Sequence, residues 1–253
     1  MKLLFLGTAS GLSESQTNYH SNLILVSNSG KKLLIDCGTD IRFSLAHANI
    51  NPIDVDAVYI SHLHHDHVGG LTWFAFKHKF RPKAHKPLLI VHQELAQPLW
   101  EHCLAGGMET LEDEQASLHS FFNVHSLYDN QEFHWEGASI RLVKTVHVLS
   151  NHRVMPSYGL ILGYKKNKIF ITTDTQFNKD LLPYYKEASL IFHDCETSHS
   201  PSGVHAHFEQ LVNLDSQIKN KMWLYHYNDG VLPKAEEEGF LGFVKCGQEF
   251  RID

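Results

Sequence analysis

The stretch His62-Leu63-His64-His65-Asp66-His67 gathers five potential metal-binding side chains within six residues. It follows the apolar residues 55–60, which are typical of a buried strand. The pair Gly69-Gly70 comes next, and the apolar residues 71–76 then predict the start of a helix. The stretch is therefore expected in a loop at the C-terminal end of a strand, which is where α/β proteins usually build their sites.

The spacing within this loop favours metal binding, because imidazole nitrogens and carboxylate oxygens are the usual ligands of zinc and related ions. His62 and His64 are two residues apart, so in extended backbone they point the same way and can share one ion. Asp66 and His67 are adjacent in a turning segment and can reach a second ion. His65 is expected to be solvated or to lie behind the ligands. The loop therefore predicts the beginning of two neighbouring metal sites.

Three more candidate ligands stand where later predicted strands end. His147 follows a predicted strand over residues 140–146, Asp174 ends an apolar run that begins at residue 169, and His226 ends one that begins at residue 223. A single histidine after a strand is usually a hydrogen-bonded structural residue. Three such residues after a complete first motif favour metal ligation instead.

The motif His62-x-His64-x-Asp66-His67 after an apolar strand resembles the signature of the metallo-β-lactamase superfamily. His147, Asp174 and His226 follow that superfamily's later motifs in order and type. Asp36-x-Gly38 resembles another of its landmarks, in which the aspartate braces the metal loop by hydrogen bonds. The resemblance covers essentially the whole chain. It implies the α/β class and a four-layer αβ/βα sandwich, formed by residues 1–253 as a single domain.

The resemblance also implies seven ligands for two divalent ions. The first ion would be held by His62, His64 and His147, the second by Asp66, His67 and His226, and Asp174 would bridge both. A water between the ions would lose a proton near neutral pH and become the nucleophile. Zinc is the expected metal, and manganese or iron suits the same donors.

Residues 190–197 and 202–211 resemble the ribonuclease Z branch, which contains tRNA 3′-processing endonucleases and related phosphodiesterases. His205 stands where that branch has a helix-opening histidine that protonates the leaving oxygen. Asp194 stands where it has a glutamate that orients this histidine. A neighbouring carboxylate raises the pKa of a histidine, which suits a proton donor near pH 7. The resemblance therefore implies His205, Asp194 and Asp66 as catalytic residues.

The match to this branch is not complete, so two alternatives stay open. Aspartate replaces glutamate at position 194, and Cys195 follows it. His207 is therefore a second candidate for the proton donor, and Glu196 is a second candidate for the orienting acid.

The length between two motifs narrows the expected substrate. His147 and Asp174 are 174 − 147 = 27 positions apart, which is room for one hairpin, residues 158–164 and 168–172, but not for the long tRNA-gripping arm of bacterial members. The formal net charge is −6, which gives no general attraction to a large nucleic acid. A small phosphodiester fits better. Compact members of the branch resemble cyclic-nucleotide phosphodiesterases, including phage enzymes that degrade signalling cyclic nucleotides.

Candidate substrate contacts are less specific. A nucleobase could stack on an aromatic ring, and rings near the predicted strand ends belong to Tyr158, Phe177, Tyr225 and Tyr227. Each of these is more often a core residue. Arg153 could meet a phosphate, although a solvated loop arginine is as common.

Other functions are compatible with the same motifs. An ester, thioester or lactone hydrolase would use the same metal pair, a tRNA nuclease would share the branch, and a metal-stabilised sensor would turn nothing over. The resemblance also implies a homodimer, for which the apolar helix residues Trp73, Phe74, Phe76 and Phe80 could supply an interface or equally be core.

Composition agrees with a globular enzyme. Hydrophobic residues make up 43% of the 253 positions, and the four cysteines form no Cys-x-x-Cys pair, so a reduced, cytoplasmic setting is expected. The apolar run after Lys2 is shorter than that of a signal peptide, and no run is long enough to span a membrane.

Overall fold

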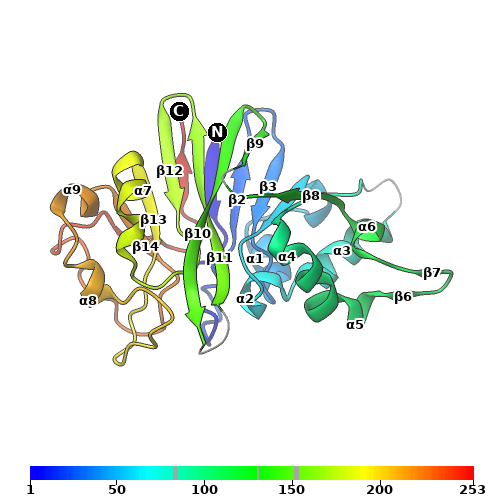
Figure 1. The fold of residues 1–253 in the computed structure, drawn as a ribbon, viewed down its shortest axis with the longest axis horizontal. Coiled ribbons are helices and arrows are strands. Elements are labelled where there is room, and N and C mark those ends of the chain that lie inside the picture. The colour runs from blue at the N-terminus through cyan, green and yellow to red at the C-terminus, as the bar shows by residue number, and fades with distance from the viewer. Residues whose placement is uncertain (82–84, 130, 151–153) are drawn as a thin grey trace. The chain divides into compact units, whose positions relative to one another are not determined.

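The computed structural model describes residues 1–81, 85–129, 131–150 and 154–253. The chain divides into two compact units, each with one seven-stranded sheet (Figure 1). The first unit contains Met1–Gly7, Tyr19–Tyr128 and Gly247–Arg251. The second contains Thr8–Asn18, Asp129–Cys246 and Ile252–Asp253. That residues 1–253 act as one domain stays a prediction.

The sheet of the first unit has the order β16-β1-β2-β3-β4-β5-β8. Its strands are β1 (Lys2–Phe5), β2 (Leu23–Val26), β3 (Lys32–Ile35), β4 (Ala57–Ile60), β5 (Leu88–His92), β8 (Asn123–Leu127) and β16 (Glu249–Arg251). β3, β4, β5 and β8 run parallel, and the near-continuous burial of β4 and β5 is typical of parallel strands covered on both faces. The C-terminal ends of β3 and β4 therefore meet at one edge, where Asp36 and His62 follow them.

The helical segments of the first unit lie between these strands. They are α1 (Ile41–His47), η1 (Pro52–Asp54), α2 (His65–Val68), α3 (Leu71–Lys79), α4 (Gln93–Pro98), η2 (Leu99–Leu104), α5 (Ala105–Met108) and α6 (Leu118–Phe121). Helix α4 changes after Pro98 into a π-helical segment, η2. The short strands β6 (Thr110–Leu111) and β7 (Glu114–Gln115) pair into a small antiparallel ribbon, which is labelled in Figure 1.

Helix α1 begins without a side-chain cap. Asp40 is its N-cap residue and makes no capping hydrogen bond. Its carboxylate accepts instead from the backbone N–H of His20 at 2.8 Å. A long-range contact thus uses an oxygen atom that could otherwise cap the helix.

The sheet of the second unit has the order β15-β14-β13-β12-β11-β10-β9. Its strands are β9 (Glu132–Trp135), β10 (Ala138–Leu149), β11 (Val154–Tyr164), β12 (Asn167–Ile171), β13 (Leu190–Asp194), β14 (Met222–Tyr225) and β15 (Gly242–Phe243). β9 to β12 are antiparallel neighbours, whereas β12 to β15 run parallel. The parallel part brings the segments after β12, β13 and β14 to one edge.

The second unit contains two hairpins, one between β9 and β10 and one between β11 and β12. Glu136 and Gly137 join β9 to β10 with positive φ angles of 50° and 81°, as a two-residue hairpin turn requires. β11 and β12 form the hairpin that was predicted before Asp174, with β11 beginning earlier, at Val154. The described residues between His147 and Asp174 are otherwise the end of β10 and the short links, which agrees with the predicted lack of room for an arm.

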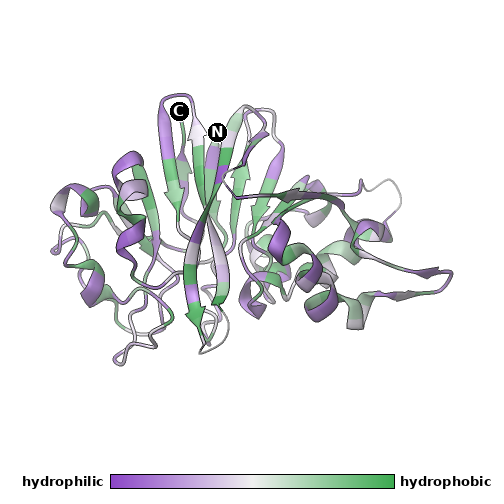
Figure 2. Cartoon of the chain, viewed as in Figure 1, coloured by the Kyte–Doolittle hydropathy of each residue, from purple (hydrophilic) through white to green (hydrophobic). Residues whose placement is uncertain are grey.

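Helices cover the parallel part of the second sheet. They are η3 (Lys179–Leu181), α7 (Leu182–Glu187), α8 (Phe208–Leu211) and α9 (Ser216–Lys219), and they lie beside β13 and β14 (Figure 1). Phe170, Tyr185 and Leu211 belong to the hydrophobic core of this unit. Figure 2 shows hydrophobic colour along the strands and mixed colour on the helices, as expected for sheets that helices cover. None of the helices in the described ranges is long and apolar enough to cross a membrane.

Candidate metal centre

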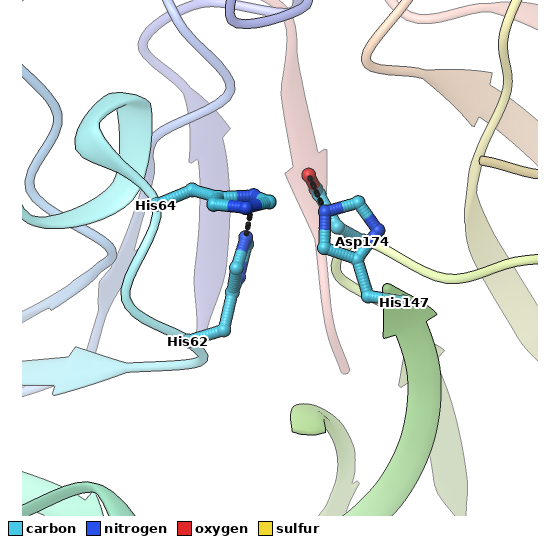
Figure 3. Close-up of side chains that lie close together, drawn as sticks. All are labelled: His62, His64, His147 and Asp174. Atoms are coloured by element: carbon cyan, nitrogen blue, oxygen red, sulfur yellow. Dashed lines mark hydrogen bonds and ion pairs between the residues drawn. The ribbon is translucent and has the colours of Figure 1, made fainter. Parts of the chain in front are cut away.

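In the first unit, the loop after β4 gathers the four predicted ligands. His62 is fully buried, and its Nε2 lies 3.2 Å from Nδ1 of His64, as the dashed line in Figure 3 marks. Two nitrogens that bind one tetrahedral zinc ion at about 2.0–2.1 Å lie roughly 3.3–3.4 Å apart. The spacing of these nitrogens therefore fits a shared ion. His65 points to an exposed position, in agreement with its predicted separation from the ligands.

Asp36 braces this loop, as the resemblance implied. Its buried carboxylate accepts hydrogen bonds from the backbone N–H of Ser61 at 2.8 Å, from the Ser61 hydroxyl at 2.8 Å and from Nδ1 of His67 at 2.7 Å. Asp36 has a φ of 62°, in the left-handed region that residues other than glycine seldom adopt. Such backbone strain is tolerated where the surroundings fix it, and it is common at functional sites.

These hydrogen bonds decide where two histidines carry their protons. A carboxylate only accepts, so His67 is protonated at Nδ1 and its lone pair lies on Nε2. The Ser61 hydroxyl donates to Asp36, so its oxygen accepts from Nδ1 of His62 at 3.0 Å, and the His62 lone pair also lies on Nε2. Nε2 of His67 stands 3.0 Å from an Asp66 oxygen. A cation removes the repulsion between these two atoms, so the donor set fits a metal ion.

Backbone contacts hold the metal loop against the segment after β3. The Cys37 N–H donates to the His67 carbonyl at 2.7 Å, and the Gly70 N–H donates to the Cys37 carbonyl at 2.9 Å. A Cβ atom on Gly38 would lie 2.0 Å from the Asp66 carbonyl oxygen. Position 38 therefore requires glycine, because two backbone segments approach each other there.

In the second unit, three predicted ligands come together. His147 stands at an irregularity of β10, where its pairing with β11 shifts register between Val146 and Val148. Its Nδ1 donates to the Val204 carbonyl at 2.8 Å, so its lone pair lies on Nε2, which is 3.7 Å from Asp174 Oδ2 (Figure 3). Nε2 of His226 lies 3.4 Å from the same oxygen. All three side chains are buried.

Burial lowers the pKa of His147, and this effect outweighs the neighbouring carboxylate of Asp174, which raises it. The ring is therefore neutral near pH 7, which is the form that binds a metal ion.

The backbone at the other two ligands is strained. Thr173, directly before Asp174, has a φ of 51°, and His226 itself has a φ of 63°.

Asp194 and His205 form a pair beside these ligands. Nδ1 of His205 donates to Asp194 Oδ2 at 2.8 Å, and the Thr175 N–H donates to the same oxygen at 2.9 Å. The His205 ring stacks on His226, with centroids 4.9 Å apart. The potential ligand atoms of Asp174, Asp194, His205 and His226 all lie within 4.8 Å of one another. The second unit thus places an acid–imidazole pair directly beside two predicted metal ligands.

The charges of this pair support each other. Burial alone lowers the pKa of His205, but the Asp194 carboxylate outweighs it, and the pKa is raised. Burial alone raises the pKa of Asp194, but the charge and hydrogen bond of His205 outweigh it, and that pKa is lowered. The pair therefore favours an imidazolium and a carboxylate, which leaves an Nε2–H proton on His205.

A family model described as "Anti-Pycsar protein Apyc1" matches residues 1–250. The chain is 32% identical over 255 residues to an anti-Pycsar protein Apyc1 of Paenibacillus harenae, with 100% of both chains covered. It is 33% identical over 260 residues to the protein of the same name from Bacillus phage 010DV004, with 99% and 98% covered. The chain belongs to the Apyc1 family.

Solved structures show that this Apyc1-family chain has the metallo-β-lactamase fold. YhfI from Bacillus subtilis, described as a metallo-β-lactamase fold protein, matches with a TM-score of 0.75 and 19% identity over 98% of both chains. The short form of human tRNase Z matches with a TM-score of 0.73 and 17% identity over 100% of both chains. Zn²⁺-bound PqqB from Methylobacterium extorquens matches with a TM-score of 0.73 and 12% identity over 100% of both chains. The predicted α/β class and fold are confirmed.

The family and the fold, together with the His/Asp cluster of the second unit, support the predicted class of metal-dependent hydrolase and the binding of a divalent metal ion.

The Apyc1-family structure gives the two alternative residues other contacts. Nδ1 of His207 accepts from the Glu209 N–H at 3.3 Å, and its Nε2 donates to the Ser198 carbonyl at 2.9 Å. The carboxylate of Glu196 accepts from Ser198 and Ser202. Helix α8 begins at Phe208, and His207 is its N-cap residue. His205 therefore lies before the helix, whereas the resemblance implied that it would be the residue that opens the helix.

Most of the candidate stacking rings serve packing. Tyr158 and Tyr225 are only 1% and 2% exposed. The Tyr227 hydroxyl is bonded to Thr8 and to the Val244 carbonyl, and Phe177 packs against the core of the second unit. These contacts agree with the expectation that such rings are more often core residues than base platforms. Arg153 lies outside the described residues.

The proposed dimer surface is partly core. Phe74 is fully buried, whereas Phe80 is 62% exposed. A homodimer stays a prediction.

Two supporting groups were not predicted from the sequence: the Ser61 hydroxyl and the Val204 carbonyl. Each fixes the proton on a predicted ligand. Val204 carries no chemical signal, since only its backbone is used. The position of Ser61 directly before His62 was the single available hint.

Proposed function

We propose that this Apyc1-family chain hydrolyses a small phosphodiester, specifically a cyclic nucleotide, with two divalent metal ions. The observation that carries the proposal is the Asp194–His205 pair beside Asp174 and His226. A proton donor next to metal ligands suits a reaction whose leaving group is a basic ribose oxygen. Relatives that include a phage protein named anti-Pycsar protein agree with the cyclic-nucleotide substrate that the sequence resemblance implies.

The proposed ligand set is the one expected from the sequence. It comprises His62, His64 and His147 for one ion, Asp66, His67 and His226 for the other, and Asp174 for both. The donor chemistry within each unit supports it, because Asp36, Ser61 and the Val204 carbonyl leave the Nε2 lone pairs of three histidines available as donors. When bound, such ions lower the pKa of water towards neutrality and offset negative charge on a phosphoryl oxygen. Zinc, manganese and iron all suit these donors.

The residues of the chain perform the remaining work. A hydroxide oxygen bonds to phosphorus, and the bond from phosphorus to the ribose oxygen breaks with its electron pair. The Nε2–H proton of His205 moves to that oxygen, and Asp194 holds the ring by its Nδ1–H throughout. The product of a cyclic nucleotide is then a linear nucleotide. The three partners behind the ligands, which are the Asp36 carboxylate, the Ser61 hydroxyl and the Val204 carbonyl, keep the histidine rings in place as the substrate changes.

A turnover panel tests this function. The protein loaded with zinc or manganese is incubated with cyclic nucleotides, linear dinucleotides, bis-p-nitrophenyl phosphate, a lactone, a thioester and a precursor tRNA. We expect hydrolysis of at least one cyclic nucleotide, and none in a chelator. Hydrolysis of only the lactone or thioester would establish the ester hydrolase instead, and cleavage of only the tRNA would establish the nuclease. Metal binding without any turnover would favour a sensor.

His205→Ala separates chemistry from metal binding. We expect a loss of about 10²- to 10⁴-fold in kcat on a cyclic nucleotide, with the metal content unchanged. His199→Ala is the matched control, because His199 is an exposed histidine of the same loop. Equal activity of the two variants would remove His205 from the mechanism.

A further inference from the structure

The loop that carries His205, residues 197–205, is closed at its base by backbone hydrogen bonds. The Glu196 N–H donates to the Ala206 carbonyl at 2.9 Å, and the Phe208 N–H donates to the Glu196 carbonyl at 3.0 Å. Gly203 turns the loop with a φ of 79°, a conformation that glycine adopts at little cost. The base is therefore fixed, and the position of His205 depends on what holds the rest of the loop.

The carboxylate of Glu196 holds that loop from within. It accepts from the Ser198 hydroxyl at 2.8 Å, from the Ser202 N–H at 2.9 and 3.0 Å, and from the Ser202 hydroxyl at 3.0 Å. Glu196 is only 5% exposed. A buried carboxylate is costly unless hydrogen bonds satisfy it, and here the donors all come from one short loop.

Ser202 connects the Glu196 carboxylate to the residues that follow it in the loop. The Ser202 hydroxyl donates to Glu196, and its oxygen accepts from the Val204 N–H at 3.3 Å. The Val204 carbonyl in turn accepts from Nδ1 of His147 at 2.8 Å. The residue after Val204 is His205, which donates to Asp194. One carboxylate thus fixes the segment that meets both a proposed metal ligand and the proposed proton donor.

We propose that Glu196 is a positioning residue for His205 and His147. It touches neither ring. Its two oxygen atoms fix the conformation of the loop. The loop in turn fixes the position of the His205 ring, with its Nε2–H, and of the Val204 carbonyl, which orients His147. This inference rests on the proposed function. A glutamine could not replace the glutamate, because its NH₂ group would face the N–H and O–H donors of Ser202.

Two variants and one matched control test the proposal. Glu196→Gln keeps the shape but removes one acceptor oxygen, and Ser202→Ala removes the hydroxyl link to Val204 while keeping the Ser202 N–H. Glu209→Gln makes the same chemical change at an exposed glutamate of the neighbouring helix α8. Each variant is first checked for a cooperative thermal transition, so that unfolded protein is not mistaken for inactive protein.

Kinetics with two leaving groups is the first measurement. At saturating metal, we expect Glu196→Gln to lower kcat for a cyclic nucleotide by about 10- to 100-fold with little change in KM. The loss with bis-p-nitrophenyl phosphate should be much smaller, since p-nitrophenolate leaves without a proton. Ser202→Ala should follow in the same direction with a smaller loss. An equal loss on both substrates would contradict the positioning of His205.

Metal affinity, measured by competition with a chromophoric chelator, is the second measurement. We expect Glu196→Gln to weaken zinc binding by about 10-fold, because the partner behind His147 shifts. The proposal would be overturned if Glu196→Gln had the same kinetics and zinc affinity as Glu209→Gln. If Glu196→Gln does not fold, the same comparison is made with Ser202→Ala. If the unaltered protein hydrolyses no phosphodiester, the proposed function fails, whereas the affinities still decide whether Glu196 positions His147.

Discussion

Nδ1 of His67 donates a hydrogen bond across 2.7 Å to the carboxylate of Asp36, and both side chains are buried. The bond joins the segment after β3 to the metal loop after β4. Through the Ser61 hydroxyl the same carboxylate also fixes the proton of His62. Asp36, which binds no metal in the proposed scheme, therefore keeps the Nε2 lone pairs of both His67 and His62 available for a metal ion.

Asp36→Asn should weaken metal binding by about 10- to 100-fold, which is typical for loss of a partner behind a metal-binding histidine. The asparagine NH₂ must face one of three donors, so we also expect a loss of about 1–3 kcal/mol in the free energy of unfolding. Chelator competition and urea unfolding measure the two effects. Asp54→Asn, at an exposed aspartate of the same unit, is the control. Unchanged metal affinity in Asp36→Asn would contradict the bracing role.

Gly38→Ala should destabilise the protein and weaken metal binding together. The added Cβ would lie 2.0 Å from the Asp66 carbonyl oxygen, so the metal loop must move. We expect a loss of about 1–3 kcal/mol, as for other overpacked sites. Gly106→Ala is the matched control, because its Cβ in helix α5 meets nothing within 4 Å, and helix propensity predicts a gain of up to about 1 kcal/mol. Equal urea midpoints for the two variants would show that the close approach does not matter.

His78 should make the stability of the protein depend on pH. It is buried in α3, with Nδ1 2.9 Å from the His85 carbonyl and Nε2 3.1 Å from the Pro52 carbonyl. Burial lowers the pKa of His78, and this outweighs the two carbonyls, which raise it. The unfolded chain therefore binds the proton more readily than the folded chain. This residue costs no stability at high pH, and the cost grows as pH falls below about 6.5.

Unfolding free energies of the unaltered protein and of His78→Gln between pH 5 and 8 measure this dependence. The difference between their pH slopes should not exceed about 1.4 kcal/mol per pH unit, the limit for one proton. His102→Gln, which removes an exposed histidine, is the control. Parallel curves for the unaltered protein and His78→Gln would contradict the prediction.

Much of the centre could be predicted from the sequence because its chemistry is local. Four proposed ligands stand within six residues after β4, and the apolar runs that precede Asp174 and His226 are strands β12 and β14. Parallel strands bring their ends to one edge, so the order of the motifs carries spatial information. The pairing of Asp194 with His205 followed instead from the resemblance to the ribonuclease Z branch.

What the sequence did not reveal depends on tertiary contacts. His205 and His207 have the same chemistry and are two residues apart, and only their partners, Asp194 and the Ser198 carbonyl, separate them. Tyr158 and Tyr225 stand near strand ends, but burial decides that they pack. The π-helical turn after Pro98 likewise has no periodic signature, because six residues are too few to reveal a period.

In the proposed metal centre, seven side chains hold two ions. Anomalous diffraction from crystals of the zinc-loaded protein tests it most directly. We expect two peaks, one bound by His62, His64 and His147, the other by Asp66, His67 and His226, with Asp174 bound to both. A single peak at full loading, or peaks bound by other side chains, would contradict the account.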